Sequence, residues 1–170
     1  AICVAFINAY ANETNEREAV EAIRRALPGL HVDRSSAILP EIREFERTST
    51  AALNAYLQPV VSRYLRRLDG GLKERGFGGH VLIVQSNGGV MTIDTASERP
   101  VRTALSGPAA GVIAASVIAT AAGSPDIVTG DMGGTSFDVC LVAGGTPALR
   151  AQTAIDFGLV VRTPMIDIHT

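Results

Sequence analysis

Apolar residues recur every three or four positions through one long segment in the middle of the chain. Its apolar side chains belong to Leu53, Tyr56, Leu57, Val60, Val61, Tyr64, Leu65, Leu68 and Leu72. Because arginine and lysine side chains lie off this stripe, the pattern predicts an amphipathic helix of about 25 residues. We expect the stripe to pack in the protein core and Pro59 to bend the helix. A surface for a partner subunit is the alternative interpretation of the stripe.

Shorter patterns on the N-terminal side predict a strand, a helix and a second strand. An apolar run at residues 2–7 predicts the first strand, and residues 31–36 are a short candidate for the second. Helical spacing at residues 16–27 predicts the helix between them, which Pro28-Gly29 ends. This order is the repeating unit of a parallel α/β sheet.

The C-terminal part of the chain alternates between short strands, glycine turns and one helix of small residues. Strands are predicted at residues 81–84, 101–105, 127–128, 139–142, 149–151 and 157–161. A helical turn is predicted at residues 94–98. The small-residue helix at 109–122 begins at Ser106-Gly107-Pro108, where proline suits the first turn. The chain is therefore predicted to have an α/β fold, and 127–128 and 139–142 are predicted to form a hairpin.

Composition places the chain among globular proteins of one-domain size. It has 170 residues, of which 46% are hydrophobic and 19% charged, and its net charge is −2. These values favour a sizeable core and do not indicate nucleic acid or an anionic membrane as a partner. No apolar run approaches the roughly 18–20 residues that cross a bilayer. Cys3 and Cys140 stand inside apolar runs, where we expect buried small side chains of a cytoplasmic protein.

The clearest candidate for chemistry is a turn between two predicted strands, Asp131-Met132-Gly133-Gly134-Thr135-Ser136-Phe137-Asp138-Val139. Two carboxylates bracket this turn, and carboxylates repel phosphate unless a cation lies between them. Its glycine and hydroxyl residues offer N–H and O–H donors to an anion. The combination predicts a loop that holds a nucleotide phosphate through a divalent metal ion. A hairpin with an Asx-type turn and no function is the alternative interpretation.

Five segments together resemble the A subunit of the hydantoinase/5-oxoprolinase family. They are LPEIREFERTST at residues 39–50, NAYL at 54–57, QSNGG at 85–89, LSGPAAGV at 105–112 and DMGGTSFDV at 131–139. The small-residue helix followed by the last segment also resembles the second phosphate-binding hairpin of actin-like ATPases. The resemblance implies a ribonuclease H-like fold in part. Residues 1–48 would end a first lobe, 49–105 would form a bridging helix and strand, and 106–170 would begin a second lobe.

The resemblance also implies an activity. It implies an ATP-dependent cyclic amidohydrolase that opens N-methylhydantoin or hydantoin and works with a B-type subunit in a hetero-oligomer. A 5-oxoprolinase or the ATP-using subunit of a ketone carboxylase is the alternative within the enzyme class. A non-catalytic, actin-like nucleotide switch is the alternative outside it.

Site residues follow from the resemblance position by position. Asp131 and Asp138 would be catalytic and would engage Mg²⁺ or its bound water. The residues that would contact the phosphates of ATP are Gly133, Gly134, Thr135 and Ser136. Ser106 and Gly107 would direct a helix N-terminus toward an anion, or would only begin a capped helix.

Four further motifs are candidates for a site or for a structural role. The loop at residues 85–89 is a substrate- or partner-contacting loop or a strand-ending turn. A helical stretch is predicted at residues 41–47. A salt-bridge network or part of a substrate site is the role of the charged cluster formed by Arg43, Glu44, Glu46, Arg47 and Thr48. The hydroxyl residues at 48–50 predict a helix cap or kink. Asp167 and His169 have a spacing that suits a metal, although no other ligand is in reach.

The chain departs from the actin-like pattern in what it lacks. It contains no second Asp-x-Gly-x-Thr sequence and no adenosine-binding glycine segment, and residues 167–170 stop where a glycine-rich stretch would follow. It also begins and ends beside predicted strands. We therefore expect an internal fragment that holds about half of an ATP site. Alone, it is expected neither to hydrolyse ATP nor to bind it tightly.

Overall fold

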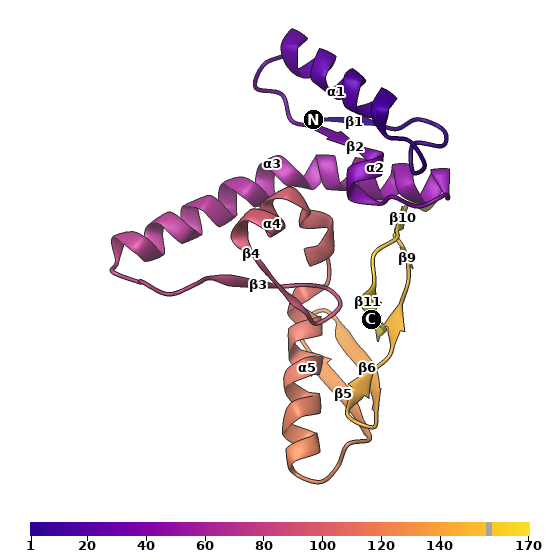
Figure 1. Ribbon diagram of the computed structural model, residues 1–170. Coiled ribbons are helices and arrows are strands. Elements are labelled where there is room, and N and C mark those ends of the chain that lie inside the picture. The colour runs from indigo at the N-terminus through magenta and orange to yellow at the C-terminus, as the bar shows by residue number, and fades with distance from the viewer. Residues whose placement is uncertain (156–157) are drawn as a thin grey trace. The chain divides into compact units, whose positions relative to one another are not determined.

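The computed structural model describes residues 1–155 and 158–170 and has mixed α/β secondary structure (Figure 1). The chain divides into two compact units, each built from three separate stretches. The first unit contains Ala1–Val81, Thr92–Val101 and Thr153–Thr163. The second unit contains Leu82–Met91, Arg102–Gln152 and Pro164–Thr170. Within the described residues, no helix is long and apolar enough to cross a membrane.

The first unit begins with the predicted strand, helix and strand. Strands β1 (Ile2–Val4) and β2 (Val32–Arg34) pair in parallel, and α1 (Thr14–Ala26) supplies the crossover that a parallel pair requires. Val4, Val20 and Val32 form a small core between helix and strands. Figure 1 shows the two strands between α1 on one side and α3 on the other.

Both strands are shorter than predicted because a buried carboxylate takes the backbone groups that would extend them. Glu16 of α1 is fully buried. Its Oε1 accepts the N–H of Phe6 just after β1 at 2.9 Å, and its Oε2 accepts the N–H of Ser36 at 2.9 Å. Ser36 lies in a helical turn, α2 (Ser35–Ile38), where the sequence predicts a continued strand. Hydrogen bonds to Glu16 therefore take the place of strand pairing at both ends.

The long helix α3 (Glu44–Glu74) is continuous through the hydroxyl-rich segment where a cap or kink is predicted, and it continues through Pro59. The cap prediction is wrong, because the helix begins before these residues and their hydroxyl groups bind backbone groups outside it. Ser49 Oγ accepts the N–H of Val160 and Thr50 Oγ1 accepts the N–H of Arg162, both at 2.9 Å. The helix thus binds the backbone of a distant strand through its side chains.

The predicted apolar stripe of α3 is only partly buried. Leu65 is buried, whereas Tyr56, Val60 and Tyr64 are 76%, 69% and 63% exposed. The buried face carries small and polar residues, which are Ser49, Thr50, Ala51, Asn54, Ala55 and Ser62. Small side chains let β1, β2 and α4 approach the helix closely, and this approach determines which face is inward.

Asn54 shows how a polar side chain is accommodated on that face. Its Nδ2 donates to Asp33 Oδ2 at 2.8 Å and to the Glu98 carbonyl at 2.9 Å, while its Oδ1 accepts the N–H of Val101 at 3.3 Å. A fully buried amide with all of these partners satisfied costs little to bury. It therefore connects α3 to β2 and to the end of α4 (Ile93–Glu98).

The segment from residue 81 to residue 105 differs from the prediction in two places. Strand β3 (Leu82–Val84) pairs with β4 (Val90–Thr92), which the sequence pattern does not predict, and Leu82 is exposed rather than buried. A 3₁₀ helix, η1 (Pro100–Thr103), replaces the extended segment predicted at residues 101–105. Proline at its first position fits a helical turn better than a strand. The helix predicted at residues 94–98 is confirmed as α4.

The second unit is built on a helix and an antiparallel hairpin. Helix α5 (Ser106–Ala121) precedes β5 (Ile127–Met132) and β6 (Phe137–Ala143), as predicted. β12 (Ile168–His169) pairs with the other edge of β6, and β7 (Thr146–Pro147) also pairs with β6. The core consists of Ala109, Val112, Cys140, Val142 and Ile166. The expected burial of Cys140 is confirmed, whereas Cys3 is only partly buried.

Two short antiparallel pairs complete the two units. β8 (Leu149–Arg150) pairs with β11 (Met165–Ile166) in the second unit, which confirms the strand predicted at residues 149–151. β9 (Thr153–Ala154) pairs with β10 (Val160–Val161) in the first unit. Part of the strand predicted at residues 157–161 lies outside the described residues.

Candidate functional site

The two carboxylates of the diagnostic turn face each other across the hairpin. β5 and β6 extend further than their apolar runs suggest, and Asp131 lies directly opposite Asp138 in the register. The preceding pairs on the same face are Thr129 with Cys140 and Ile127 with Val142. Since Cys140 and Val142 belong to the core beneath α5, the aspartates continue the face of the hairpin that α5 covers.

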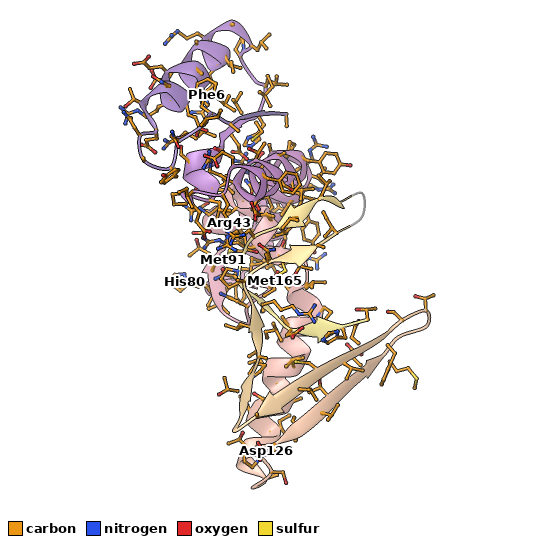
Figure 2. The ribbon with its side chains drawn as sticks, turned by 90° about the vertical axis from the view of Figure 1, so that its right-hand side faces the viewer. Phe6, Arg43, His80, Met91, Asp126 and Met165 are labelled. Atoms are coloured by element: carbon orange, nitrogen blue, oxygen red, sulfur yellow. The ribbon has the colours of Figure 1, made fainter. Side chains whose placement is uncertain are left out.

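The path of the chain brings this carboxylate pair back to the start of α5. The helix of 16 residues is about 24 Å long, and the six residues of β5 return over about 20 Å in the opposite direction. Figure 1 shows α5 lying alongside β5 and β6. Asp126, at the other end of the hairpin, lies near the end of the helix (Figure 2).

A cavity of about 490 Å³ lies between the helix and this face of the hairpin. Both aspartates line it, together with Pro108, Gly111, Val112 and Ala115 of α5, residues 127–130, Val139, Cys140 and Ile168. Glycine and alanine on the helix leave this space open, since a Cβ added at Gly111 would meet no atom within 4 Å. The volume is typical of small-molecule sites.

A third strand adds a hydroxyl group to the carboxylates. β12 pairs with β6 so that Ile168 lies opposite Cys140 and His169 opposite Val139. Thr170 therefore follows on toward Asp138, and its Oγ1 donates a hydrogen bond to Asp138 Oδ1 at 2.5 Å. Thr170 was not predicted as a site residue, because the register that places it there joins strands about 30 residues apart in sequence. No local pattern could indicate this register.

The remaining predicted site residues do not line the cavity. Gly133, Gly134, Thr135 and Ser136 form the exposed tip of the hairpin, where the Gly133 N–H donates to the Ser136 carbonyl at 3.0 Å. Ser106 and Gly107 lie in the first turn of α5, which no side chain caps. Of that turn, Pro108 is the residue that lines the cavity.

The chemistry of the cavity end suits a hard cation. Like charges directly opposite each other on neighbouring strands repel, so a cation between Asp131 and Asp138 would be stabilising. Mg²⁺ prefers oxygen ligands and commonly takes one or two carboxylates while it keeps several waters. The two carboxylates fit that need, although the described residues contain no cluster of three or more His, Cys, Asp or Glu side chains.

Asp167 and His169 are not arranged as metal ligands. Asp167 forms an ion pair with Arg150, and Arg150 Nη2 lies 2.8 Å from His169 Nε2. Asp167 Oδ1 also lies 3.3 Å from His169 Nε2, so the Arg150 guanidinium already supplies a positive charge to both of these groups. The cluster contributes to holding β12 and β8 in place, which supports a structural role.

The charged segment near residue 43 is also mainly structural. Arg47 is fully buried, and its guanidinium donates to the carbonyls of Glu41 and Phe6 at 2.6 and 2.8 Å and to Ser35 Oγ at 3.0 Å. Arg43 pairs with Glu46 on the surface at 2.9 Å. These contacts favour the salt-bridge interpretation of the segment over a substrate site.

Comparison with known proteins gives consistent matches across the chain. A protein-family model described as hydantoinase/oxoprolinase matches residues 47–170. The chain is 36% identical over 173 residues to caprolactamase subunit alpha of Pseudomonas jessenii, covering 100% of the chain and 24% of that protein. It is 33% identical over 171 residues to 5-oxoprolinase of Saccharomyces cerevisiae, covering 100% of the chain and 13% of that protein.

Solved structures share the fold. The crystal structure of ATP-dependent caprolactamase from Pseudomonas jessenii matches with a TM-score of 0.84 and 37% identity, over 100% of this chain and 25% of that one. The nucleotide-free structure of acetone carboxylase matches with a TM-score of 0.84 and 27% identity, over 98% of this chain and 24% of that one. The chain thus spans about a quarter of the length of these two structures.

Proposed function

The chain belongs to the hydantoinase/oxoprolinase family, and we propose that it forms the phosphate-side part of the ATP site in an ATP-dependent cyclic amidohydrolase. The observation that carries this proposal is the row formed by Asp131 of β5, Asp138 of β6 and Thr170, the residue after β12. This row ends at a cavity whose other wall is the first part of α5. Relatives named as ATP-dependent enzymes support the nucleotide.

The proposed roles follow from the charges and donors at this end of the cavity. Asp131 and Asp138 would hold Mg²⁺, which offsets phosphate charge when it is bound. Backbone and hydroxyl donors of residues 133–136 and of Ser106 and Gly107 would orient the phosphates. In phosphoryl transfer the protein mainly positions groups and offsets charge, and these residues would supply one side of that arrangement.

The actin-like arrangement of lobes remains part of the proposal. In this arrangement residues 1–48 complete a first lobe, residues 49–105 form a helix and strand that bridge the lobes, and residues 106–170 begin a second lobe. A parallel strand pair with its crossover helix at the N-terminus and a small-residue helix followed by the hairpin support it. Such a site needs a second phosphate hairpin from elsewhere in the full-length protein.

The proposed reaction is the opening of a hydantoin-type ring, in which ATP makes the ring carbonyl a better electrophile by phosphorylating its oxygen. The names caprolactamase and 5-oxoprolinase support a cyclic amide as the substrate class. The match to acetone carboxylase keeps an ATP-using carboxylase subunit as a specific alternative. Relatives named as subunits support a hetero-oligomer, and the partner in this proposal is a B-type subunit. The two unpaired cysteines suit a cytoplasmic location.

The test is an assay of the full-length protein with its partner subunit, MgATP and hydantoin. We expect a carbamoyl amino acid and inorganic phosphate, and we expect Asp131→Asn to abolish both. Asp126→Asn is the matched control, since Asp126 lies on the same hairpin but accepts the Gly144 N–H at 2.7 Å, away from the cavity. ATP hydrolysis without product from any cyclic amide would favour a nucleotide switch. A carboxylated product from a ketone and bicarbonate would favour the carboxylase.

A further inference from the structure

Ser86 connects three segments of the second unit although it stands in a turn far from the cavity residues in sequence. It is 1% exposed. Its N–H and its hydroxyl both donate to the carbonyl of Arg102 at 2.8 Å, and its Oγ accepts the N–H of Leu105 at 3.2 Å. Its carbonyl accepts the N–H of Ile166 at 2.8 Å. The hydrogen-bonding groups of this serine are therefore engaged by two other segments.

One of these segments leads directly into α5. Leu105 is the N-cap residue of the helix, and no side chain of its own segment caps it. The hydroxyl of Ser86 therefore holds the backbone at the point where the helix begins. Pro108 and Gly111 follow within the first turns and line the cavity, so the position of this wall depends on how the helix start is held.

The other segment leads to the opposite wall of the cavity. Ile166 ends β11, and two residues later Ile168 of β12 lines the cavity. The hydroxyl of Thr170 then donates a hydrogen bond to Asp138 Oδ1. Ser86 is thus hydrogen-bonded to the two segments that lead into the cavity walls. One segment precedes α5, and the other precedes Ile168 and Thr170.

The turn that carries Ser86 packs closely against α5 at a glycine. Gly88 has φ +84°, and a Cβ added there would lie 2.7 Å from two side-chain atoms of Ile113 in α5 and 3.2 Å from Ile166. The turn also closes on itself, because the Asn87 side chain accepts the N–H of Gly89 at 2.9 Å. A turn held in this way provides a fixed support for the hydroxyl of Ser86.

We propose that Ser86 is a positioning residue that sets the first turn of α5 relative to the Asp131–Asp138 pair. This inference rests on the proposed function, since the geometry it sets is that of the phosphate-side cavity. Ser86 acts through the backbone of residues 102–105 and touches neither carboxylate. A displacement of about 1 Å in a positioned group can reduce a rate 100-fold, so loss of one hydroxyl has a measurable consequence.

The experiment compares Ser86→Ala, Ser86→Thr and Ser116→Ala in the full-length protein. Ser116 is the matched control, because it is a buried serine of α5 whose hydroxyl donates only within its own helix, to the Ile113 carbonyl at 3.1 Å. We expect Ser86→Ala to speed hydrogen exchange in residues 102–112 about tenfold and to lower kcat/KM for MgATP by about 10- to 100-fold. Ser86→Thr keeps the hydroxyl and is expected to recover most of both.

The two readouts separate the inference from the proposed function. Hydrogen exchange needs no nucleotide, so unchanged exchange in Ser86→Ala overturns the inference whatever the enzyme does. Faster exchange with unaltered kcat/KM, or equal losses in Ser86→Ala and Ser116→Ala, also overturns it. ATP turnover that survives Asp131→Asn overturns the proposed function instead, and this variant leaves Ser86 and its contacts intact.

Discussion

The buried carboxylate of Glu16 and the buried guanidinium of Arg47 meet at one hydroxyl group. Ser35 Oγ donates to Glu16 Oε1 at 2.5 Å and accepts from Arg47 Nε at 3.0 Å. Both charged residues are fully buried, and both also bind the backbone of Phe6. The network therefore holds the end of β1, the start of α2 and the first turns of α3 together.

Removing the guanidinium should be strongly destabilising. Arg47→Ala leaves the buried carboxylate of Glu16 and hydroxyl of Ser35, and two partly buried carbonyls, without its guanidinium, and we expect the free energy of unfolding to fall by about 3–5 kcal/mol. Arg66→Ala, an exposed arginine of the same helix, should change it by less than about 0.5 kcal/mol. Urea unfolding followed by circular dichroism measures both. A loss below about 1 kcal/mol for Arg47→Ala would contradict the structural role.

The same network predicts a loss of stability in acid. Burial opposes ionisation of Glu16, but hydrogen bonds from Ser35, Ser36 and Phe6 outweigh it, so the pKa of Glu16 lies below its usual value. A lowered pKa contributes stability above the unfolded-state pKa of about 4.3, and this contribution is lost as pH falls through the folded-state pKa. Urea midpoints between pH 7 and pH 3 should fall less for Glu16→Gln than for the wild type. Parallel curves for the two proteins would argue against this assignment.

Cys3 should be a slow thiol. Burial, with the carboxylates of Asp33 and Glu16 nearby, raises the pKa of Cys3 to about 11. At pH 8 its thiolate fraction is then about two orders of magnitude below that of a free thiol with pKa about 8.5. Iodoacetamide labelling followed by mass spectrometry should show slow modification of Cys3 in the native protein and ordinary rates in urea. Equal rates in both conditions would show that the thiol is accessible and ionised.

Gly88 should tolerate no side chain. Gly88→Ala combines a left-handed backbone with a Cβ only 2.7 Å from Ile113, and we expect a destabilisation of about 2–4 kcal/mol. Gly134→Ala is the control, because a Cβ there meets no atom within 4 Å and its φ is not positive. Thermal unfolding of the two variants compares them. Equal melting temperatures would mean that the turn is not packed against α5 as described.

The carboxylate pair predicts a response to divalent cations. In EDTA, Asp131→Asn should raise Tm by roughly 1–4 °C, because it removes repulsion across the strands. Added MgCl₂ should raise the Tm of the wild type and leave that of Asp131→Asn nearly unchanged. A matched response of Asp126→Asn and the wild type serves as the control. If magnesium shifts all three proteins equally, the pair does not hold the ion.

Local patterns were sufficient to predict the elements that carry the fold. The parallel strand unit, the long helix and the hairpin each have a periodicity or a turn sequence of their own. The inward face of α3 was not predictable, because Asn54 is inward only through partners on β2 and α4 that lie far away in sequence. Hydrophobicity alone assigns Tyr56 to the core. In the structure Tyr56 is exposed, because the helix packs through the small side chains of Ala51 and Ala55.

In the candidate site, too, the residues of a local motif were predictable from the sequence and those placed by distant segments were not. Asp131 and Asp138 stand in one short motif, and a hairpin brings them together through local geometry. The contributions of Thr170, Pro108 and Ser86 depend on long-range register and on hydrogen bonds between segments, which no spacing rule contains. Sequence reasoning therefore finds the charged groups of such a site more readily than the residues that hold them in place.

The division of the chain into two interleaved units has a practical consequence for cloning. The polypeptide passes from one unit to the other five times, at 81/82, 91/92, 101/102, 152/153 and 163/164. Neither unit is a continuous piece of sequence, so a truncation that removes one necessarily cuts into the other. Expression of either unit by itself would require a rearranged gene with new linkers, and point substitutions are the cleaner way to separate their contributions.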